Sequence, residues 1–249
     1  MIRVASWNVR EGLPDHSADP ADRPAALAAL TAQVRAQALD VLALQEIDVD
    51  PAGWSAVLAA LREDTPLRYA HSGVLSPSTY LPGHHAAIGL ASRVPIAGHG
   101  LDLLPNPGLT AERDGRPMTS YDKGLIAGTV ELSGLRVTLV SVHALPFRRF
   151  GRTPEEPAFA PVWRAMADRI GKLGDGPLVV CGDFNTPRRD LLLGVADRPL
   201  ARAVGDRPTH RGRATDDILY SAELALAGEP LVLPGFSDHD LCVAGLVRA

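Results

Sequence analysis

The chain has 249 residues, of which 46% are hydrophobic and 22% are charged, as in an ordinary globular protein. Its formal net charge of −4 argues against a protein that holds duplex DNA through the field of its whole surface, although a local basic patch is compatible with that charge. Composition does not change along the chain, and no flexible linker interrupts it. We therefore expect one domain over residues 1–249.

The apolar runs are all too short to span a membrane, and the N-terminus has the pattern of a strand rather than of a signal peptide. These features predict a cytoplasmic protein without a membrane span. Cys181 and Cys242 each lie in an apolar run, and no framework of paired cysteines is present. We expect both to be buried free thiols.

In chain order, the hydrophobic pattern predicts a strand over residues 2–9, a helix over 25–39, a strand over 41–45, a helix over 54–61, strands over 86–91, 123–132 and 135–142, a helix from Pro161, and strands over 178–181, 217–220, 223–227 and 241–247. Ser133-Gly134, between two of these strands, is typical of a hairpin turn. Regular alternation of strands and helices fails in the middle of the chain. The pattern therefore favours a layered α/β (α+β) sandwich over a doubly wound parallel sheet.

Three segments lack a regular pattern: residues 72–85, 105–122 and 146–157. Loops of this length in a compact domain are usually functional or mobile. We expect the first two to border the mouth of a functional site, because long loops on a rigid sheet carry specificity.

Polar side chains follow four of the predicted strands, at the point where each strand ends. Asn8, Glu46 and His143 each come directly after an apolar run, and Asp183 and Asn185 follow a fourth. Any one of these residues could be an ordinary solvated turn residue. Their repetition at the ends of buried strands indicates a functional site at one sheet edge.

Near the C-terminus the order reverses. Asp216 precedes one apolar run, and Asp238 and His239 precede another. If these two strands run antiparallel to the first four, all of these polar groups meet at the same edge.

The polar residues belong to motifs that resemble the endonuclease/exonuclease/phosphatase superfamily, which includes DNase I-like nucleases, abasic-site endonucleases, sphingomyelinases and inositol polyphosphate 5-phosphatases. The motifs follow the family's order along the whole chain: Ser6-Trp7-Asn8-Val9, Leu44-Gln45-Glu46, Val142-His143, Cys181-Gly182-Asp183-Phe184-Asn185-Thr186-Pro187, Thr215-Asp216-Asp217-Ile218-Leu219-Tyr220-Ser221 and Phe236-Ser237-Asp238-His239. The resemblance implies a DNase I-like four-layer αββα sandwich with two central mixed β-sheets and the site at one edge of both. One motif departs from the family pattern, because Asp217 stands where Tyr or His is usual, so either Asp216 or Asp217 could be the partner of His239.

A phosphate ester repels an anionic nucleophile, and its leaving oxygen needs stabilising; a hard cation addresses both problems. Mg²⁺ prefers one or two carboxylates and several waters, which suits Glu46 and Asp238 with Asn8 nearby. Mn²⁺ is the alternative ion. Zinc is disfavoured, because no Cys/His ligand spacing occurs.

The resemblance implies roles for the remaining residues. His239 and Asp216 would form a dyad in which the carboxylate orients the imidazole. Asp183 and Asn185 would position or deprotonate the attacking water, and His143 would donate hydrogen bonds to the phosphoryl oxygens. We therefore predict a metal-dependent phosphoesterase, and a non-catalytic binding module is the least favoured alternative.

The substrate is predicted only as a phosphodiester or a phosphomonoester. Basic residues in loops beside the site strands favour a nuclease for DNA or RNA: Arg148, Arg149, Arg152, Arg188, Arg189, Arg207, His210, Arg211 and Arg213. Lys123, followed by Gly124, instead resembles the sphingomyelinase and inositol phosphatase branches, and an ammonium suits a terminal phosphate. Lys123 and Arg188 are the candidate substrate-binding residues.

Overall fold

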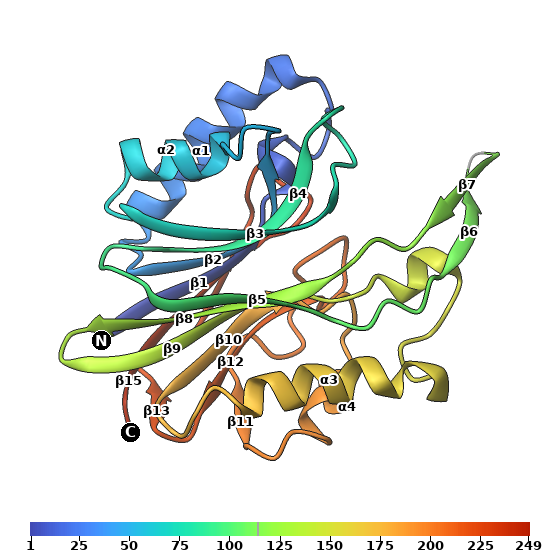
Figure 1. Cartoon of the computed structure of the whole chain (residues 1–249). Coiled ribbons are helices and arrows are strands. Elements are labelled where there is room, and N and C mark those ends of the chain that lie inside the picture. Colours follow the sequence, from blue (N-terminus) through green and yellow to red (C-terminus); the bar gives the residue numbers. More distant parts are fainter. Residues whose placement is uncertain (114) are drawn as a thin grey trace.

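The computed structural model describes residues 1–113 and 115–249 of the chain. Two β-sheets lie face to face, and helices cover the outer face of each sheet (Figure 1). Among the described residues, one sheet has seven strands and the other six. A two-stranded hairpin projects from the body (Figure 1). The expected four-layer αββα sandwich with two central mixed sheets is confirmed.

Strand order defines the two sheets. Along the seven-stranded sheet it is β13 (Leu224–Leu226), β15 (Leu241–Arg248), β1 (Ile2–Asn8), β2 (Val41–Val49), β4 (His85–Ser92) and β3 (Tyr69–Pro77), with β14 (Leu231–Leu233) also paired to β15. Along the six-stranded sheet it is β11 (Leu200–Arg202), β12 (Asp216–Ser221), β10 (Leu178–Asp183), β9 (Leu135–His143), β8 (Gly124–Leu132) and β5 (Ala97–Leu103). The projecting hairpin consists of β6 (Thr110–Arg113) and β7 (Arg116–Thr119).

Helices occupy the outer layers and the connections. The α-helices are α1 (Arg23–Ala36), α2 (Ala56–Asp64), α3 (Ala160–Gly171) and α4 (Asp190–Leu193). Short 3₁₀ helices are η1 (Arg10–Gly12), η2 (Pro20–Asp22), η3 (Phe147–Phe150) and η4 (Pro157–Phe159). Among the described residues, no helix is both long and apolar enough to cross a membrane.

In the part of the chain that the structure describes, three apolar clusters hold the four layers together. Val34 of α1 packs on the outer face of the seven-stranded sheet, and Met166 and Ile170 of α3 pack on the outer face of the six-stranded sheet. The third cluster fills the space between the sheets, where each buried aliphatic side chain contributes about 1.5–3 kcal/mol. Cys181 and Cys242 lie in this central cluster as free thiols, as expected.

Strand direction brings the predicted site residues to one edge. β1 is parallel to β2, and β9 is parallel to β10, so each pair ends on the same side. β15 runs antiparallel to β1 and β12 runs antiparallel to β10, so the residues that precede β12 and β15 lie at those same ends. A hydrogen bond from Asn8 to Asp183 joins the ends of the two sheets. The expectation of one common edge, called the site edge below, is confirmed.

Glu46 lies inside β2 rather than at its end, which corrects the sequence-based prediction. Leu44 pairs with Gly89 and Ile47 pairs with Ala87, so Glu46 falls in a β-bulge. Its φ of +52° is in the left-handed region, which is unfavourable for a residue with a side chain. A bulge re-aims the side chain that it carries, and here that side chain is a candidate metal ligand.

The segments predicted to be irregular contain regular structure. β3 occupies much of residues 72–85, β6 and β7 lie within 105–122, and η3 lies within 146–157. β5 is also absent from the prediction. β3 and β5 are edge strands that expose apolar residues: Val74 is 45% exposed and Leu101 is 37% exposed. Such strands lack the alternating apolar pattern by which a half-buried strand is found.

Both predicted specificity segments still leave the sheets at the site edge. His85 of β4 pairs with Val49 near the end of β2, and Gly124 of β8 pairs with His143. The helix boundaries shift by small amounts. For example, α2 begins at Ala56, because Ser55 caps it by accepting a hydrogen bond from the backbone N–H of Leu58.

Candidate active site

Asp183, His143 and Asp216 stand next to one another on three neighbouring strands. Asp183, at the end of β10, is paired with His143 of β9 and with Asp216 of β12. All three residues are almost completely buried. Gly182 allows this arrangement, because a Cβ at that position would lie 2.2 Å from the carbonyl oxygen of Val142. The glycine of the motif therefore permits the close approach of β10 to β9.

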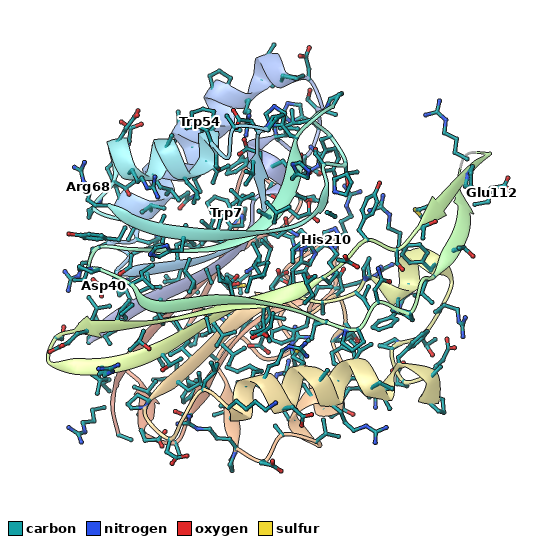
Figure 2. All side chains as sticks on the ribbon, viewed as in Figure 1. Trp7, Asp40, Trp54, Arg68, Glu112 and His210 are labelled. Carbon is teal, nitrogen blue, oxygen red and sulfur yellow. The ribbon has the colours of Figure 1, made fainter. Side chains whose placement is uncertain are left out.

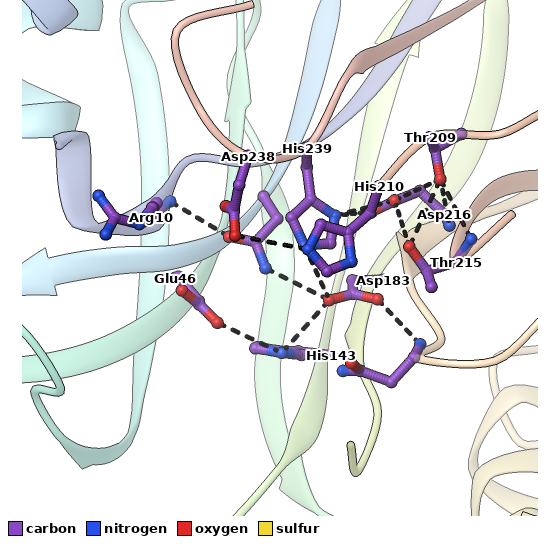
Figure 3. A network of polar contacts seen from close by, with 12 residues as sticks. Arg10, Glu46, His143, Asp183, Thr209, His210, Thr215, Asp216, Asp238 and His239 are labelled. Carbon is purple, nitrogen blue, oxygen red and sulfur yellow. Dashed lines mark hydrogen bonds and ion pairs between the residues drawn. The ribbon is translucent and has the colours of Figure 1, made fainter. Parts of the chain in front are cut away.

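Three nitrogen atoms converge on one oxygen of Asp183 (Figure 3). Oδ2 of Asp183 lies 3.3 Å from Nδ2 of Asn8, 3.6 Å from Nε2 of His143 and 3.8 Å from Nε2 of His239. Burial raises the pKa of Asp183 to about 6, although the charge of His239 acts in the opposite direction. The carboxylate is therefore ionised at neutral pH but close to taking up a proton.

Asn185 fixes the other oxygen of Asp183. Its backbone N–H donates to Oδ1 at 2.8 Å. Its own side chain donates to the carbonyl oxygen of Ala144 at 2.9 Å, and its φ is +54°. A strained backbone of this kind persists only where the surroundings hold it, so Asn185 orients the carboxylate rigidly.

Asp216 and His239 form a hydrogen-bonded pair. Nδ1 of His239 donates to Asp216 and lies 2.9 Å from Oδ2 and 3.1 Å from Oδ1. The hydroxyl groups of Thr209 and Thr215 also donate to Oδ2, at 2.6 and 2.9 Å. Because Nδ1 is engaged, Nε2 of His239 is the nitrogen that faces Asp183.

Both members of this pair are charged. Burial opposes a positive ring, but the carboxylates of Asp216 and Asp183 outweigh burial and raise the pKa of His239 to about 10. Burial likewise opposes the carboxylate of Asp216, but His239 and the two threonine hydroxyls lower the pKa of Asp216 below its ordinary value. At neutral pH His239 thus carries a proton on Nε2, directed to the space beside Asp183.

Asp217 points to other partners and takes no part in the pair. Its carboxylate accepts a hydrogen bond from Arg202 at 2.8 Å and lies 3.5 Å from Nε of Arg189. Neighbouring residues of a strand point to opposite faces, so only one of two consecutive aspartates can face the site. The structure places Asp216, and not Asp217, against His239.

Lys123 reaches into the site beside His143. Its Nζ lies 3.0 Å from Nε2 and 3.2 Å from Nδ1 of that ring. Burial and the ammonium of Lys123 hold the pKa of His143 well below its ordinary value, so this ring is neutral. Burial also lowers the pKa of Lys123, against the charges of Glu46 and Asp183. Nε2 of His143 is also 3.8 Å from Oε1 of Glu46. His143 therefore contacts both Asp183 of the six-stranded sheet and Glu46 of the seven-stranded sheet.

Glu46 and Asp238 are the more exposed acids of the site. Their side chains are 26% and 17% exposed. Burial, followed by the charges of Glu46 and Asp238, raises the pKa of Tyr80 to about 12, so both carboxylates lie close to that ring. The Arg10 guanidinium lies over the Tyr80 ring, 4.4 Å from its centre.

The donor atoms at this position fit a hard divalent cation. Glu46, Asp238 and the amide oxygen of Asn8 are oxygen ligands, which Mg²⁺ and Mn²⁺ prefer. Oδ1 of Asn8 accepts a hydrogen bond from the backbone N–H of Arg10 at 3.1 Å and keeps a second lone pair. A cation would also offset the negative charge of Glu46 and Asp238, and Asp238 already has His210 at 3.5 Å and Arg211 at 3.8 Å.

Acids and histidines are packed more tightly elsewhere in the site. Within the described residues, possible ligand atoms gather in two groups, Asp183–Asp216–His239 and His210–Asp238–His239. In the first group, Asp216 and His239 already satisfy each other by hydrogen bonding. Glu46 with Asp238 therefore remains the carboxylate pair best suited to a cation.

Several motif residues hold the site together without facing it. Nε1 of Trp7 donates to the carbonyl oxygen of His239 at 3.0 Å, and Oγ of Ser237 donates to the backbone of β1 at 2.8 Å. These bonds fasten the Ser-Asp-His segment to the seven-stranded sheet. Nε2 of Gln45 donates to Oγ of Ser141 at 2.9 Å and links β2 to β9 of the other sheet.

Three residues that contact the Asp216–His239 pair are not identifiable from the sequence as its partners. Thr209 and Thr215 donate to Asp216, and the ring of His210 stacks on that of His239. Thr215 belongs to a motif, but Thr209 and His210 precede it in a loop rich in arginine, which indicated phosphate binding instead. No periodicity in the sequence shows that this loop folds back onto the pair.

Arg188, a candidate substrate-binding residue, lies apart from these groups. Its guanidinium is 2.7 Å from both a carboxylate oxygen of Asp190 and one of Glu155. The side chain lines an open hollow of about 680 Å³ together with Arg202, and none of the site residues named above lines it. Contact with Arg188 therefore requires a substrate that extends beyond the site edge.

The fold is similar to that of several solved structures. An endonuclease/exonuclease/phosphatase from Beutenbergia cavernae DSM 12333 is 20% identical, with a TM-score of 0.73, and the match covers 100% of this chain and 72% of that one. D. rerio TDP2, complexed with single strand DNA product, is 15% identical, with a TM-score of 0.66 and 99% of each chain covered. The Bacteroides thetaiotaomicron VPI-5482 mannosyl-6-phosphatase Bt3783 is 14% identical, with a TM-score of 0.60 and coverage of 99% and 100%.

At these identities the likeness shows a common fold. No curated protein sequence matches the chain significantly. Residues 5–239, from the strand that carries Asn8 to His239 itself, match the family model described as Endonuclease/Exonuclease/phosphatase family. The chain therefore belongs to the endonuclease/exonuclease/phosphatase family.

Proposed function

We propose that this protein is a metal-dependent phosphoesterase that hydrolyses a phosphomonoester or a phosphodiester by attack of water. The observation that supports this most is the convergence on Oδ2 of Asp183, where Nε2 of His143 and Nε2 of His239 lie at 3.6 and 3.8 Å. A phosphoryl group beside these atoms would have one carboxylate placed to accept a proton from the attacking water. It would also have two imidazoles placed to donate hydrogen bonds to the phosphoryl oxygens.

The charge of each residue fits a distinct task. Asp183 is ionised at neutral pH and, with a pKa of about 6, accepts a proton from the attacking water. His239 is protonated and donates from Nε2 to a phosphoryl oxygen as negative charge builds there. Asp216 stabilises that positive ring, and Asn185 keeps Asp183 in position. The neutral ring of His143 donates from one nitrogen, with the ammonium of Lys123 beside it.

Glu46 and Asp238, with Asn8, would hold the divalent cation, Mg²⁺ or Mn²⁺. When bound, the cation supplies the Lewis acidity that stabilises charge on the phosphoryl and leaving oxygens. The bulge at Glu46 and the bond from Ser237 to β1 hold these carboxylates at the site edge.

A small phosphate ester fits the surface better than a polynucleotide. Many basic side chains in the loops that adjoin the site strands are already bonded: Arg152 to Glu156, Arg188 to Asp190 and Glu155, Arg211 to Asp15, and Arg207 to backbone carbonyl groups. Lys123, by contrast, is half-buried beside His143 and offers a point charge to a terminal phosphate. We therefore favour a phosphorylated head group or inositol phosphate, in the manner of the sphingomyelinase and inositol phosphatase branches.

A nuclease for DNA or RNA is the second candidate. Arg148, Arg149 and Arg213 are exposed, and within the described chain none of them has a carboxylate partner. Three free guanidinium groups could bind phosphates along an extended strand. The fold shared with D. rerio TDP2, whose structure contains a single strand DNA product, is compatible with this alternative.

One assay separates these candidates. The purified protein with Mg²⁺ is offered plasmid DNA, RNA, bis-p-nitrophenyl phosphate, sphingomyelin and inositol phosphates, each with and without excess EDTA. We expect turnover of at least one phosphate ester that is lost with EDTA and in Asp183→Asn. Turnover that persists undiminished in Asp183→Asn would contradict the proposal, because the proposed base would be absent.

A further inference from the structure

Residues 209–213 form a tight turn that folds back onto the Asp216–His239 pair. The backbone N–H groups of His210 and Arg213 donate to each other's carbonyl oxygens at 3.0 and 2.9 Å. Arg211 and Gly212 between them have φ values of +47° and +77°, as in a type I′ turn. The N–H of Asp240 donates to the carbonyl oxygen of Thr209 at 2.7 Å, which fastens the turn to the segment that carries His239.

The turn lays the ring of His210 flat on the ring of His239. The ring centroids are 4.1 Å apart and the planes differ by 2°. The His210 side chain is 23% exposed and that of His239 only 6%, so His210 covers one face of the inner ring. Nε2 of His210 also lies 3.5 Å from Oδ2 of Asp238. Figure 2 locates His210 in the whole chain, and Figure 3 shows the two rings overlapping.

This stacked pair does not form a metal site with Asp238, although the three side chains are close enough to be considered one. A metal ion binds the lone pair of an imidazole nitrogen, which lies in the plane of the ring. Two parallel rings whose centroids are 4.1 Å apart share no such plane. His210 and His239 therefore cannot bind one ion in this arrangement, and the contact calls for another explanation.

The hydrogen bond to Asp216 leaves one movement of the His239 ring unrestrained. It fixes the position of Nδ1, but the ring can still tilt about that point and swing Nε2 away from Asp183. A flat neighbour in contact with one face blocks this tilt. Offset stacking is a favourable arrangement of two aromatic rings, and the rings of His210 and His239 are stacked in parallel.

We propose that His210 is a positioning residue, which holds the plane of His239 so that Nδ1 stays on Asp216 and Nε2 stays aimed at the space beside Asp183. The inference deepens the proposed phosphoesterase function and rests on it, since Nε2 is the proposed donor to the phosphoryl group. His210 itself does not touch the reacting atoms, and its effect passes through His239.

Kinetics of three substitutions test the role. His210→Ala should lower kcat on the order of 10- to 100-fold, the loss that follows from misplacing a catalytic group, while KM changes little. His210→Phe keeps a flat ring and should recover most of that loss. His210→Gln keeps a polar group near Asp238 but no ring, and should resemble the alanine variant. His16→Ala, at an exposed histidine, is the matched control.

A fourth variant perturbs the turn without touching the ring. A Cβ at Gly212 would meet no atom within 4 Å, so Gly212→Ala disturbs only the backbone, whose φ of +77° disfavours alanine. We expect a smaller fall in kcat in the same direction. Thermal unfolding of every variant shows whether the chain still folds.

The closing experiment does not depend on turnover. NMR of the substrate-free protein records the Nδ1–H proton that His239 donates to Asp216, assigned by its absence in His239→Gln. We expect this signal to broaden or vanish in His210→Ala and to persist in His210→Phe. If no phosphate ester is ever hydrolysed, the phosphoesterase proposal fails while this signal still tests the positioning. An unchanged signal with unchanged kcat in His210→Ala would overturn the positioning role. Recovery by glutamine but not by phenylalanine would also overturn it and assign the effect to Asp238.

Discussion

The two sheets contribute side chains to the site that differ in their exposure to water. At the seven-stranded sheet, the side chains of Glu46 and Asp238 are 26% and 17% exposed. At the six-stranded sheet, those of His143, Asp183 and Asp216 are 1–3% exposed. Figure 3 shows Glu46 and Asp238 on one side of Asp183 and Asp216 on the other.

This contrast separates two chemical requirements. A hydrated cation must enter and exchange waters, which an exposed pair of carboxylates permits. Proton positions must stay fixed, which a buried network favours because charges interact more strongly away from water. Asp238 and His239 are adjacent in the chain but serve different halves. The Ser-Asp-His segment is therefore the point at which the two halves are coupled.

Removal of the cation should have the largest effect, because it disables the exposed half entirely. Excess EDTA should abolish turnover, and added Mg²⁺ or Mn²⁺ should restore it. Glu46→Gln should raise the metal concentration for half-maximal activity on the order of 10- to 100-fold or more, with thermal unfolding unchanged. Glu63→Gln, an exposed glutamate of α2, is the matched control. Full turnover in excess EDTA would end the idea of a metal-dependent half.

Loss of the dyad should come next, since it disables the buried half. His239→Ala should lower kcat on the order of 10²–10⁴-fold, and Asp216→Asn should lower it less, because the ring is disoriented but not deleted. The double variant should resemble His239→Ala, because residues that act as a unit are not additive. If the losses of the two single variants simply multiply in kcat/KM, the two residues act independently.

Asp217→Asn tests the same assignment from the other side. Asp217 is buried beside Arg202 and Arg189, so its loss should lower the unfolding temperature through unpaired charges rather than lower kcat. A large fall in kcat with unchanged stability would move the dyad by one residue.

The buried half should also impose a pH limit. The pKa of Asp183 is raised to about 6, and only its ionised form accepts a proton. As pH falls through 6, the carboxylate becomes protonated, so kcat/KM should fall about tenfold for each further pH unit. A pH–rate profile at constant Mg²⁺ measures this limb, with stability checked at each pH. A profile that stays flat down to pH 5 would show that Asp183 is not the base.

The smallest effects should distinguish the two substrate-binding candidates. Lys123→Met should raise KM about tenfold, as expected for a lost hydrogen bond to a charged group, and more for a monoester than for a matched diester. Arg188→Met should raise KM less than about threefold, because its guanidinium is already paired at an exposed position. A larger effect of Arg188→Met than of Lys123→Met would favour an extended substrate such as a nucleic acid.

The layered fold and the common site edge could be predicted from the sequence because apolar runs mark the buried strands. A polar residue that follows such a run marks the point where the strand leaves the core. Asn8, His143 and Asp183 follow this rule. Glu46 does not, since β2 resumes after its bulge, and a bulge leaves no mark in the hydrophobic pattern. The edge strands β3 and β5 escape prediction for a related reason: exposed apolar residues break the alternation.

The order and chemistry of the motifs were thus determined by the sequence alone, because strand period and residue type are local properties. Which aspartate meets His239, and what lies on the face of that ring, were decided only by tertiary structure. Asp216 and Asp217 are the same residue type, and the register of β12 against β10 determines which of them faces the site. His210 stacks on His239 although 28 residues of chain lie between them, a long-range contact that no local pattern encodes.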